Sequence, residues 1–190
     1  MPNTNSVLVK SLLAFCSLIV LATDVRAEME NPTGFVVAGT IGRSRIQDQD
    51  APDDTFDGRD FGFNLDLEWR FIENFALGMN IASFGEDSDF FNGEDTTIRV
   101  YGFGFYARGY LPINERWTLH GTLGRFAYET ESNGLSTSVI LPFTGDANTF
   151  GAGVDYALNK NWAIRFDQRW FDGADQEEGT LTTIGFRWQY

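Results

Sequence analysis

One stretch of the chain, residues 60–71, alternates strictly between two kinds of side chain. Its odd-numbered positions from 61 to 71 are large and apolar, whereas the positions between them are small, polar or charged and include Asp66, Glu68 and Arg70. A period of two is typical of a β-strand with two unlike faces. Strands of soluble sheets usually have about five or six residues, whereas a strand that crosses a bilayer needs roughly 9 to 11. The stretch therefore predicts a membrane-spanning strand of a closed barrel, with its charged face turned inward.

The amino terminus has the features of a secretory signal peptide. Lys10 precedes an apolar run at residues 11–23, and Val25 and Ala27 occupy the two positions that a signal peptidase recognises. The run is shorter than the roughly 20 residues that a membrane-spanning helix needs. Phe15 stands before Cys16, where a lipoprotein would need a small residue. We therefore expect residues 1–27 to be cleaved and residues 28–190 to form one barrel domain.

The charge balance disfavours one class of partner. The chain has 14 Lys and Arg against 27 Asp and Glu, which gives a net charge of −13. Because binding to nucleic acid depends on clustered basic residues, we expect no such partner. Beyond residue 27 the sequence has no cysteine and no apolar stretch long enough for a membrane helix. A membrane-embedded form therefore has to be a barrel.

Seven further segments alternate in a similar way, at residues 34–46, 75–82, 97–110, 117–124, 148–157, 162–171 and 180–190. With residues 60–71 they predict an all-β fold, an eight-stranded antiparallel up-and-down transmembrane β-barrel. Continuing the alternation beyond Gly124 would place Arg125 on the lipid face. That segment therefore needs either a bulge at Gly124 or an arginine that reaches the membrane rim.

The connections between these segments are of two kinds. Three are short, at residues 72–74, 111–116 and 158–161, and four are long and acidic, at residues 47–60, 83–96, 129–147 and 172–179. Within the third long connection, residues 139–141 are expected to form a small hairpin. Outer-membrane barrels have short periplasmic turns, long extracellular loops and aromatic belts at both interfaces. The pattern predicts a bacterial outer-membrane protein with periplasmic termini and a lower belt of Phe35, Trp69, Phe71, Phe75, Tyr110, Trp117, Tyr156, Trp162, Trp188 and Tyr190.

Three stretches resemble a known family, the OmpA-type eight-stranded outer-membrane barrels. They are F-G-A-G-V-D-Y-A-L at residues 150–158, W-A-I-R-F-D at residues 162–167 and Y-A-R-G-Y-L-P at residues 106–112. In that family inward acids and bases form an ionic plug, which the resemblance maps onto Arg108, Asp155, Arg165 and Asp167. Two positions depart from the family pattern: Thr40 stands in place of an inward lysine and Asn80 in place of a central acid. Asp66 and Glu68 are candidates to take over the role of that acid.

The end of the chain also resembles the family. Phe186, Trp188 and Tyr190 are similar to the C-terminal assembly signal of these barrels, which implies periplasmic chaperones and the barrel-assembly machinery as partners during biogenesis. The longer members carry a peptidoglycan-binding domain after the barrel. This sequence stops at the barrel, so we expect no tether to the cell wall.

The predicted interior holds nearly balanced charge. Its acids and bases are Asp66, Glu68, Asp155 and Asp167 against Arg70, Arg108, Arg165, Arg169 and Arg187. An eight-stranded barrel is just wide enough to be filled by its side chains, and charges confined there must be paired. The set predicts a structural ionic network. A narrow or gated ion path is the alternative.

No pattern in the sequence indicates catalysis, a metal site or a cofactor. The single histidine, His120, faces the predicted interior with Thr122 as its nearest hydroxyl on the same face, which is typical of a core histidine. The acidic loops lack a fixed ligand spacing and are expected to be solvated. We therefore expect a monomeric, non-enzymatic envelope protein of a Gram-negative bacterium that contacts outer-membrane lipid and lipopolysaccharide. A low-conductance pore and a soluble secreted barrel that binds a small apolar ligand are the alternatives.

Overall fold

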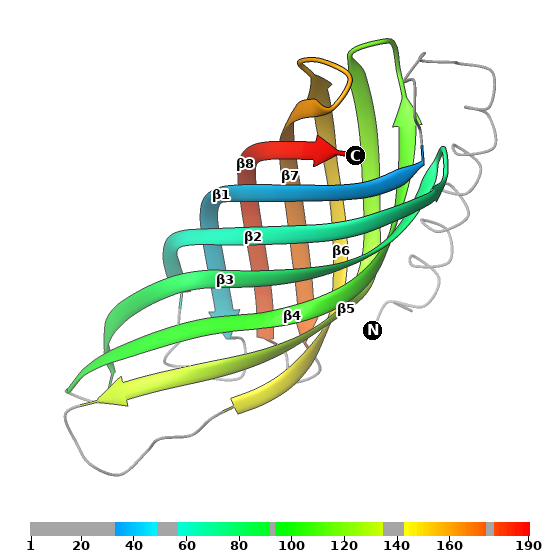
Figure 1. The fold of residues 1–190 in the computed structure, drawn as a ribbon. Helices are drawn as coiled ribbons and strands as arrows, with labels where there is room; N and C mark the ends of the chain where they lie inside the picture. Colours follow the sequence, from blue (N-terminus) through cyan, green and yellow to red (C-terminus); the bar gives the residue numbers. More distant parts are fainter. Residues whose placement is uncertain (1–32, 49–56, 92–93, 135–142, 174–176) are drawn as a thin grey trace, which may run out of the picture.

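The protein forms one closed barrel of eight antiparallel strands in the computed structural model (Figure 1). The structure describes residues 33–48, 57–91, 94–134, 143–173 and 177–190. Each strand pairs with its neighbours in sequence, and β1 pairs with β8. The predicted fold class is therefore confirmed, whereas the predicted signal peptide at residues 1–27 lies outside the described residues. The strands are β1 (Gly34–Asp48), β2 (Asp57–Ile72), β3 (Phe75–Phe91), β4 (Glu94–Pro112), β5 (Trp117–Gly134), β6 (Phe143–Ala157), β7 (Trp162–Gly173) and β8 (Glu177–Gln189).

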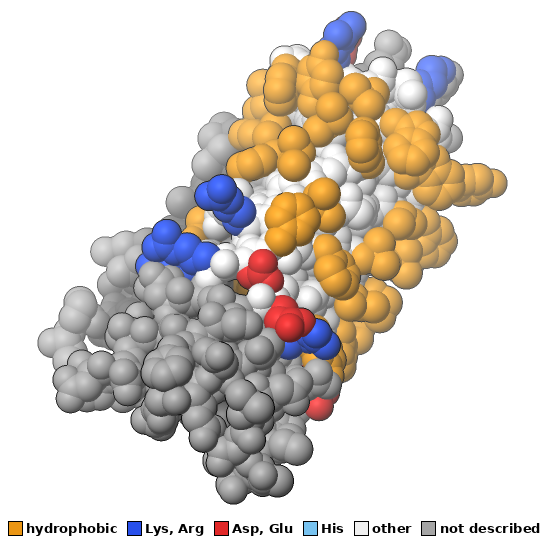
Figure 2. All heavy atoms as spheres, turned by 90° about the vertical axis from the view of Figure 1, so that its left-hand side faces the viewer, with side chains coloured by type: hydrophobic (Ala, Val, Ile, Leu, Met, Phe, Trp, Pro, Cys, Tyr) orange, Lys and Arg blue, Asp and Glu red, His pale blue; other side chains and the backbone are white. Residues whose placement is uncertain are grey.

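The two faces of each strand have the predicted orientation. On β2, Leu65 and Leu67 are 47% and 45% exposed, whereas Glu68 is 1% exposed. On β7, Phe166 is 45% exposed and Arg165 is fully buried. Figure 2 shows the resulting apolar surface along the barrel wall. The alternative of a soluble barrel with an apolar interior is therefore wrong. Among the residues described, no helix is long and apolar enough to span a membrane.

The strands extend further toward the long loops than predicted. The expected loop at residues 83–96 is largely a continuation of β3 and β4, and residues 129–134 belong to β5. Figure 1 shows the ends of β3, β4 and β5 projecting together at this end of the barrel. Acidic composition argued for loops, but backbone pairing continues here, as where Glu86 lies opposite Arg99. The predicted hairpin at residues 139–141 lies outside the described residues.

A bulge in β3 directly follows an aromatic side chain that points into the lumen. The β3–β4 register shifts between Ser83 and Glu86, and Gly85 has a φ of +88°. A positive φ favours glycine, because other residues rarely adopt it. The buried Phe84 precedes this glycine, and its carbonyl oxygen accepts a hydrogen bond from the Ser44 hydroxyl. Phe84 continues the inward alternation of Asn80 and Ala82, and the alternation shifts only beyond it, where Glu86 is exposed.

Two local predictions are resolved by the register. Pairing between β4 and β5 is unbroken across Gly124, so of the two alternatives the bulge is excluded. Arg125 instead faces outward, and its Nη2 lies 3.3 Å from the Asp146 carboxylate. Tyr110 does not belong to the lower belt as predicted, because it is 1% exposed and lies inside. Tyr110 lies two residues after Arg108 on the same strand, so both side chains point inward. This strand alternation outweighs the preference of tyrosine for the membrane interface.

Candidate functional site: the charged lumen

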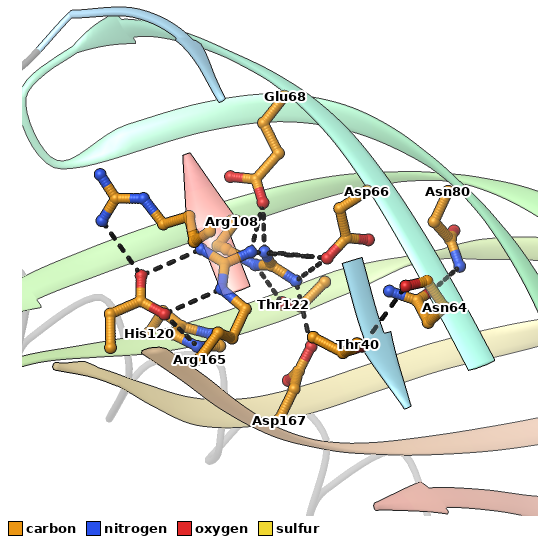
Figure 3. A network of polar contacts seen from close by, with 12 residues as sticks. Thr40, Asn64, Asp66, Glu68, Asn80, Arg108, His120, Thr122, Arg165 and Asp167 are labelled. Atoms are coloured by element: carbon orange, nitrogen blue, oxygen red, sulfur yellow. Dashed lines mark hydrogen bonds and ion pairs between the residues drawn. The ribbon is translucent and has the colours of Figure 1, made fainter. Parts of the chain in front are cut away.

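All nine charged residues predicted to face inward lie in the lumen, and none is more than 4% exposed. They come from five strands: Asp66, Glu68 and Arg70 from β2, Arg108 from β4, Asp155 from β6, Arg165, Asp167 and Arg169 from β7, and Arg187 from β8. Figure 3 shows the acids of β2 pointing across the lumen toward arginines of the opposite wall. The barrel closure therefore brings together groups that are about 100 residues apart in sequence.

Asp66 lies at the centre of this network. The Arg169 Nη2 donates hydrogen bonds to both Asp66 oxygens, at 2.8 and 2.7 Å. Arg108 and Arg165 each approach the same carboxylate to 3.4 Å. Asp66 thus accepts from three guanidinium groups, which is the arrangement expected of a central acid.

Glu68 and Asp167 extend the network to either side. Glu68 accepts hydrogen bonds from Arg108, from the Tyr110 hydroxyl and from Arg165, the last at 2.7 Å. Asp167 accepts from Arg108 at 3.3 Å and from the Arg169 Nε at 3.0 Å. Both acids therefore share Arg108 with Asp66.

Asp155 anchors the end of the network nearer the chain termini. Arg165 binds it through two parallel hydrogen bonds of 2.8 and 3.0 Å, a geometry that suits the planar guanidinium. Arg187 lies 3.3 Å from the same carboxylate. Arg187 and Arg70 also share the Gln189 side-chain oxygen, which connects Arg70 to the others.

Each carboxylate in the lumen therefore contacts at least two arginines. Burying an unpaired charge costs several kcal/mol, and this cost is offset only by close pairing and hydrogen bonding. The four acids and Arg108, Arg165, Arg169 and Arg187 meet that requirement, whereas Arg70 donates to the Gln189 side-chain oxygen and to the Glu73 carbonyl oxygen. The arrangement fills the lumen and links β2, β4, β6, β7 and β8.

The positions that depart from the family pattern are polar and uncharged. Asn80 donates a hydrogen bond of 2.9 Å to Asn64, whose oxygen also accepts from Arg169 at 3.1 Å. The Thr40 hydroxyl lies 3.4 Å from the Asn64 carbonyl oxygen. Asn64, Asn80 and Thr40 thus form an uncharged edge of the network.

Sequence reasoning missed a second layer in the lumen, which we call the aromatic plug: Phe84, Phe126 and Phe171. Their ring centroids lie 4.9 to 6.2 Å apart, and no ring is more than 5% exposed. Val100, Leu181 and small side chains complete the cluster. Phe171 follows Arg169 by two residues on β7, so the plug lies on the long-loop side of the network. The inward alternation was available for Phe171, and also for Phe84 and Phe126 once the alternation of their strands is continued beyond Ala82 and Gly124.

Two tyrosines also lie in the lumen: Tyr106, as the alternation of its strand predicts, and Tyr110, which was assigned to the lower belt. The Tyr106 ring covers Gly78, where an added Cβ would lie 2.6 Å from the ring. The guanidinium of Arg108 stacks on Tyr106 at 4.9 Å, and that of Arg70 stacks on Tyr110 at 4.3 Å. These rings occupy space between the charged groups.

His120 lies inside the barrel, as its strand parity predicts. Its Nε2 is 3.6 Å from Asp155, and its ring lies 6.1 Å from that of Tyr110. The neighbouring Thr122 hydroxyl accepts a 2.8 Å hydrogen bond from Arg108. In the described part of the chain no group of three or more His, Cys, Asp or Glu is arranged to hold a metal ion.

The predicted assembly signal lies on the outer face of β8. Phe186 and Tyr190 are 57% and 78% exposed, and the Trp188 ring lies 5.9 Å from that of Tyr190. The role of these aromatic residues in assembly stays a prediction.

Comparisons with known proteins identify related chains and folds. Residues 12–189 match the family model described as the outer membrane protein beta-barrel domain. Neisserial surface protein A (NspA) is similar in structure, with a TM-score of 0.66 and 12% identity over 83% of this chain and 97% of that one. No curated protein matches the sequence.

Two further solved structures are similar in fold. OprG from Pseudomonas aeruginosa has a TM-score of 0.58 and 12% identity, over 82% of this chain and 95% of that chain. Ail, the attachment invasion locus protein of Yersinia pestis, has a TM-score of 0.55 and 15% identity, over 83% and 99%. At such identities the likeness shows a shared fold.

Proposed function

Since the chain belongs to the outer membrane protein β-barrel family, as its resemblance to OmpA-type barrels predicted, we propose that it has a structural role in the cell envelope. The observation that supports this role is the filled lumen. The ionic network closes the barrel at mid-height, and the aromatic plug closes it again on the long-loop side. Two successive layers of packed side chains favour a rigid, sealed cylinder over a route for solutes.

A sealed lumen predicts that the purified protein is electrically silent. We expect planar-bilayer recordings of the refolded barrel to show no discrete conductance steps at any applied voltage that the bilayer withstands. Heat-modifiable migration on a gel would establish beforehand that the sample is folded. Discrete steps from folded wild-type protein would contradict the proposal.

A narrow pore is the second candidate function, and one observation favours it. Each interior carboxylate has more than one arginine partner, so the pairs are able to exchange along the barrel axis. In that case Glu68→Ala would change the size or frequency of the conductance steps. Silence in both the wild type and this variant would exclude the pore.

We also propose that the long loops face the exterior and the termini face the periplasm. Asn159 and Asp172 offer a matched test, since they lie at opposite ends of β7 and both are exposed. The only cysteine in the sequence is Cys16, in the predicted signal peptide. We expect a membrane-impermeant maleimide to label Asp172→Cys but not Asn159→Cys on intact cells. Labelling of the Asn159 variant alone would reverse the orientation.

The remaining parts of the proposal concern biogenesis and partners. We propose that the barrel is monomeric, that outer-membrane lipid and lipopolysaccharide surround it, and that periplasmic chaperones and the barrel-assembly machinery recognise its C-terminal aromatic residues. We propose no enzymatic activity, because the one histidine is enclosed in the lumen beside Asp155.

A further inference from the structure

The lumen holds one more base than acids, and the excess charge lies at the end of the barrel nearer the chain termini. Arg70 is the last inward residue of β2 at this end and is 4% exposed. Its Nη1 donates a 3.0 Å hydrogen bond to the Gln189 side-chain oxygen, and its Nη2 donates to the Glu73 carbonyl oxygen. Both acceptors are uncharged. Each of the other four interior arginines pairs with a carboxylate, whereas Arg70 has no such partner among the residues that the structure describes.

A second arginine lies beside Arg70. Arg187 of β8 donates a hydrogen bond to the same Gln189 oxygen, so two guanidinium groups converge on one uncharged atom. On β1, which lies between β2 and β8 (Figure 1), the residues opposite Gln189 and Arg187 are the buried Val36 and Ala38, and neither adds a charge. The one carboxylate at Arg187 is that of Asp155, at 3.3 Å, and another arginine binds it more closely. Positive charge is therefore concentrated at this point of the lumen.

Both arginines also keep a buried donor without a partner. The Nε atoms of Arg70 and Arg187 make no hydrogen bond to any described residue, although neither side chain is more than 4% exposed. Buried donors are normally satisfied, and one that is left unpaired destabilises the fold. Because each Nε can only donate and belongs to a cation, the missing partner is an acceptor, and an anionic acceptor is the most favourable.

The aromatic neighbour of Arg70 offsets only part of its charge. The guanidinium carbon lies 4.3 Å from the centroid of the Tyr110 ring. A cation–π contact of this kind is weaker than the cost of burying a charge that has no counterion. The Tyr110 hydroxyl does not help, because it donates its hydrogen bond to Glu68. A counterion from solution is the remaining source of negative charge.

The position of the two arginines limits the size and charge of that ion. Arg70 and Gln189 are the last inward residues of their strands, so only the turn and the strand ends separate them from water at this end of the barrel. The groups are nevertheless almost fully enclosed by the wall and by each other. A small ion fits this arrangement, whereas a phosphorylated or sugar-bearing molecule does not. One uncompensated arginine calls for one negative charge.

We propose that Arg70 and Arg187 bind a small monovalent inorganic anion, for which chloride is the probe, at the end of the lumen nearer the chain termini. The two Nε donors and the excess charge would then be satisfied together, and the ion would act as the fifth negative charge of the network. The proposal goes beyond the structural role of the barrel. It depends on the lumen alone and not on the orientation of the barrel in the membrane.

Chloride-35 NMR of the refolded protein in uncharged detergent tests the site. Exchange of chloride with a bound state broadens the resonance of the free ion, and the broadening is titrated away with bromide. We expect Arg70→Met to weaken chloride binding at least about tenfold, since a hydrogen bond to a charged group accounts for about that factor.

Arg116→Met is the matched control. Arg116 is an exposed arginine at the same end of the barrel but outside the lumen, where it donates a 3.1 Å hydrogen bond to the Tyr156 hydroxyl. We expect this variant to bind chloride within about twofold of the wild type, because water and salt already screen an exposed charge.

Gln189→Glu separates anion binding from a purely structural role of Arg70. The substitution places a carboxylate oxygen where the amide oxygen already accepts from both arginines. It supplies the missing negative charge within the chain, so we expect chloride binding to be lost although both arginines remain. In urea unfolding from zwitterionic vesicles, the wild-type midpoint should be higher in sodium chloride than in sodium gluconate at equal sodium, because a ligand that binds only the folded state stabilises it. The Gln189→Glu midpoint should be the same in both salts.

Heat-modifiable migration on a gel establishes that each variant is folded, and Gln189→Glu decides the question if Arg70→Met does not fold. Equal chloride affinity in the wild type and Arg70→Met would overturn the proposal. So would an equal loss in Arg116→Met, or a Gln189→Glu variant whose unfolding midpoint depends on chloride as strongly as that of the wild type.

Discussion

Replacing Asp66 with alanine is expected to destabilise the folded barrel by about 3 to 5 kcal/mol, which is the cost of removing one partner from a buried ion pair. Asp66 accepts hydrogen bonds from Arg108, Arg165 and Arg169. Its loss leaves three acids to balance five arginines in the lumen. Urea unfolding in lipid vesicles, followed by tryptophan fluorescence and gel migration, measures the free energy of unfolding.

The matched control is Glu115→Ala, which removes an exposed acid in the turn between β4 and β5. We expect a change within about 0.5 kcal/mol, as is usual for surface substitutions. The double variant Asp66→Ala/Arg169→Met should be more stable than Asp66→Ala by about 1 kcal/mol or more, because it removes one unbalanced guanidinium. Equal stability of Asp66→Ala and Glu115→Ala would show that the network contributes little.

The strand faces were predictable because alternation is a local property. Residues 60–71 are enough to show which side chains share a face, and the interior charges follow from the same parity on β4, β6, β7 and β8. The closed, eight-stranded topology follows from the number of such segments and from the short turns between them. None of these inferences requires knowledge of which residue lies opposite which.

The pairing inside the lumen was not predictable, because it depends on register and on contacts across the barrel. Asp66 and Arg169 meet from strands that are not neighbours in the sheet. The alternation in the sequence shows that both side chains face inward, but it does not show which residue each one pairs with. The sequence therefore predicted which charged residues lie in the lumen. It did not predict that single arginines bind more than one carboxylate.

The aromatic plug was missed for a different physical reason. Phe84 lies in an acidic stretch that had the composition of a loop, so the predicted strand ended at residue 82, although Phe84 continues the inward alternation of Asn80 and Ala82. The bulge that follows Phe84 reverses the alternation only from Glu86 onward, where the side chain is exposed. Tyr110 is a different case. The alternation of its strand placed it inside, but tyrosine is common at membrane interfaces, and this preference led to the wrong prediction.

The orientation of β2 leads to the second large effect, a contrast between adjacent residues. Leu65→Asp is expected to destabilise the barrel by about 2 to 4 kcal/mol, since it removes a lipid-exposed leucine worth about 1.5 to 3 kcal/mol and places a carboxylate in hydrocarbon. Leu65 faces outward beside Ile81, roughly midway between Trp69 and Arg59. The fraction of heat-modifiable protein after refolding into vesicles measures the loss.

Asn64→Asp introduces the same carboxylate one residue away, on the lumen side, and should remain within about 1 kcal/mol of the wild type. The Asn64 oxygen already accepts hydrogen bonds from Asn80 and Arg169, and a carboxylate oxygen preserves both. The substitution also removes the buried Asn64 Nδ2, which has no partner among the described residues. A fifth acid then balances the five interior arginines. If Asn64→Asp were the more damaging of the two, the charged face of β2 would not be the one that faces the lumen.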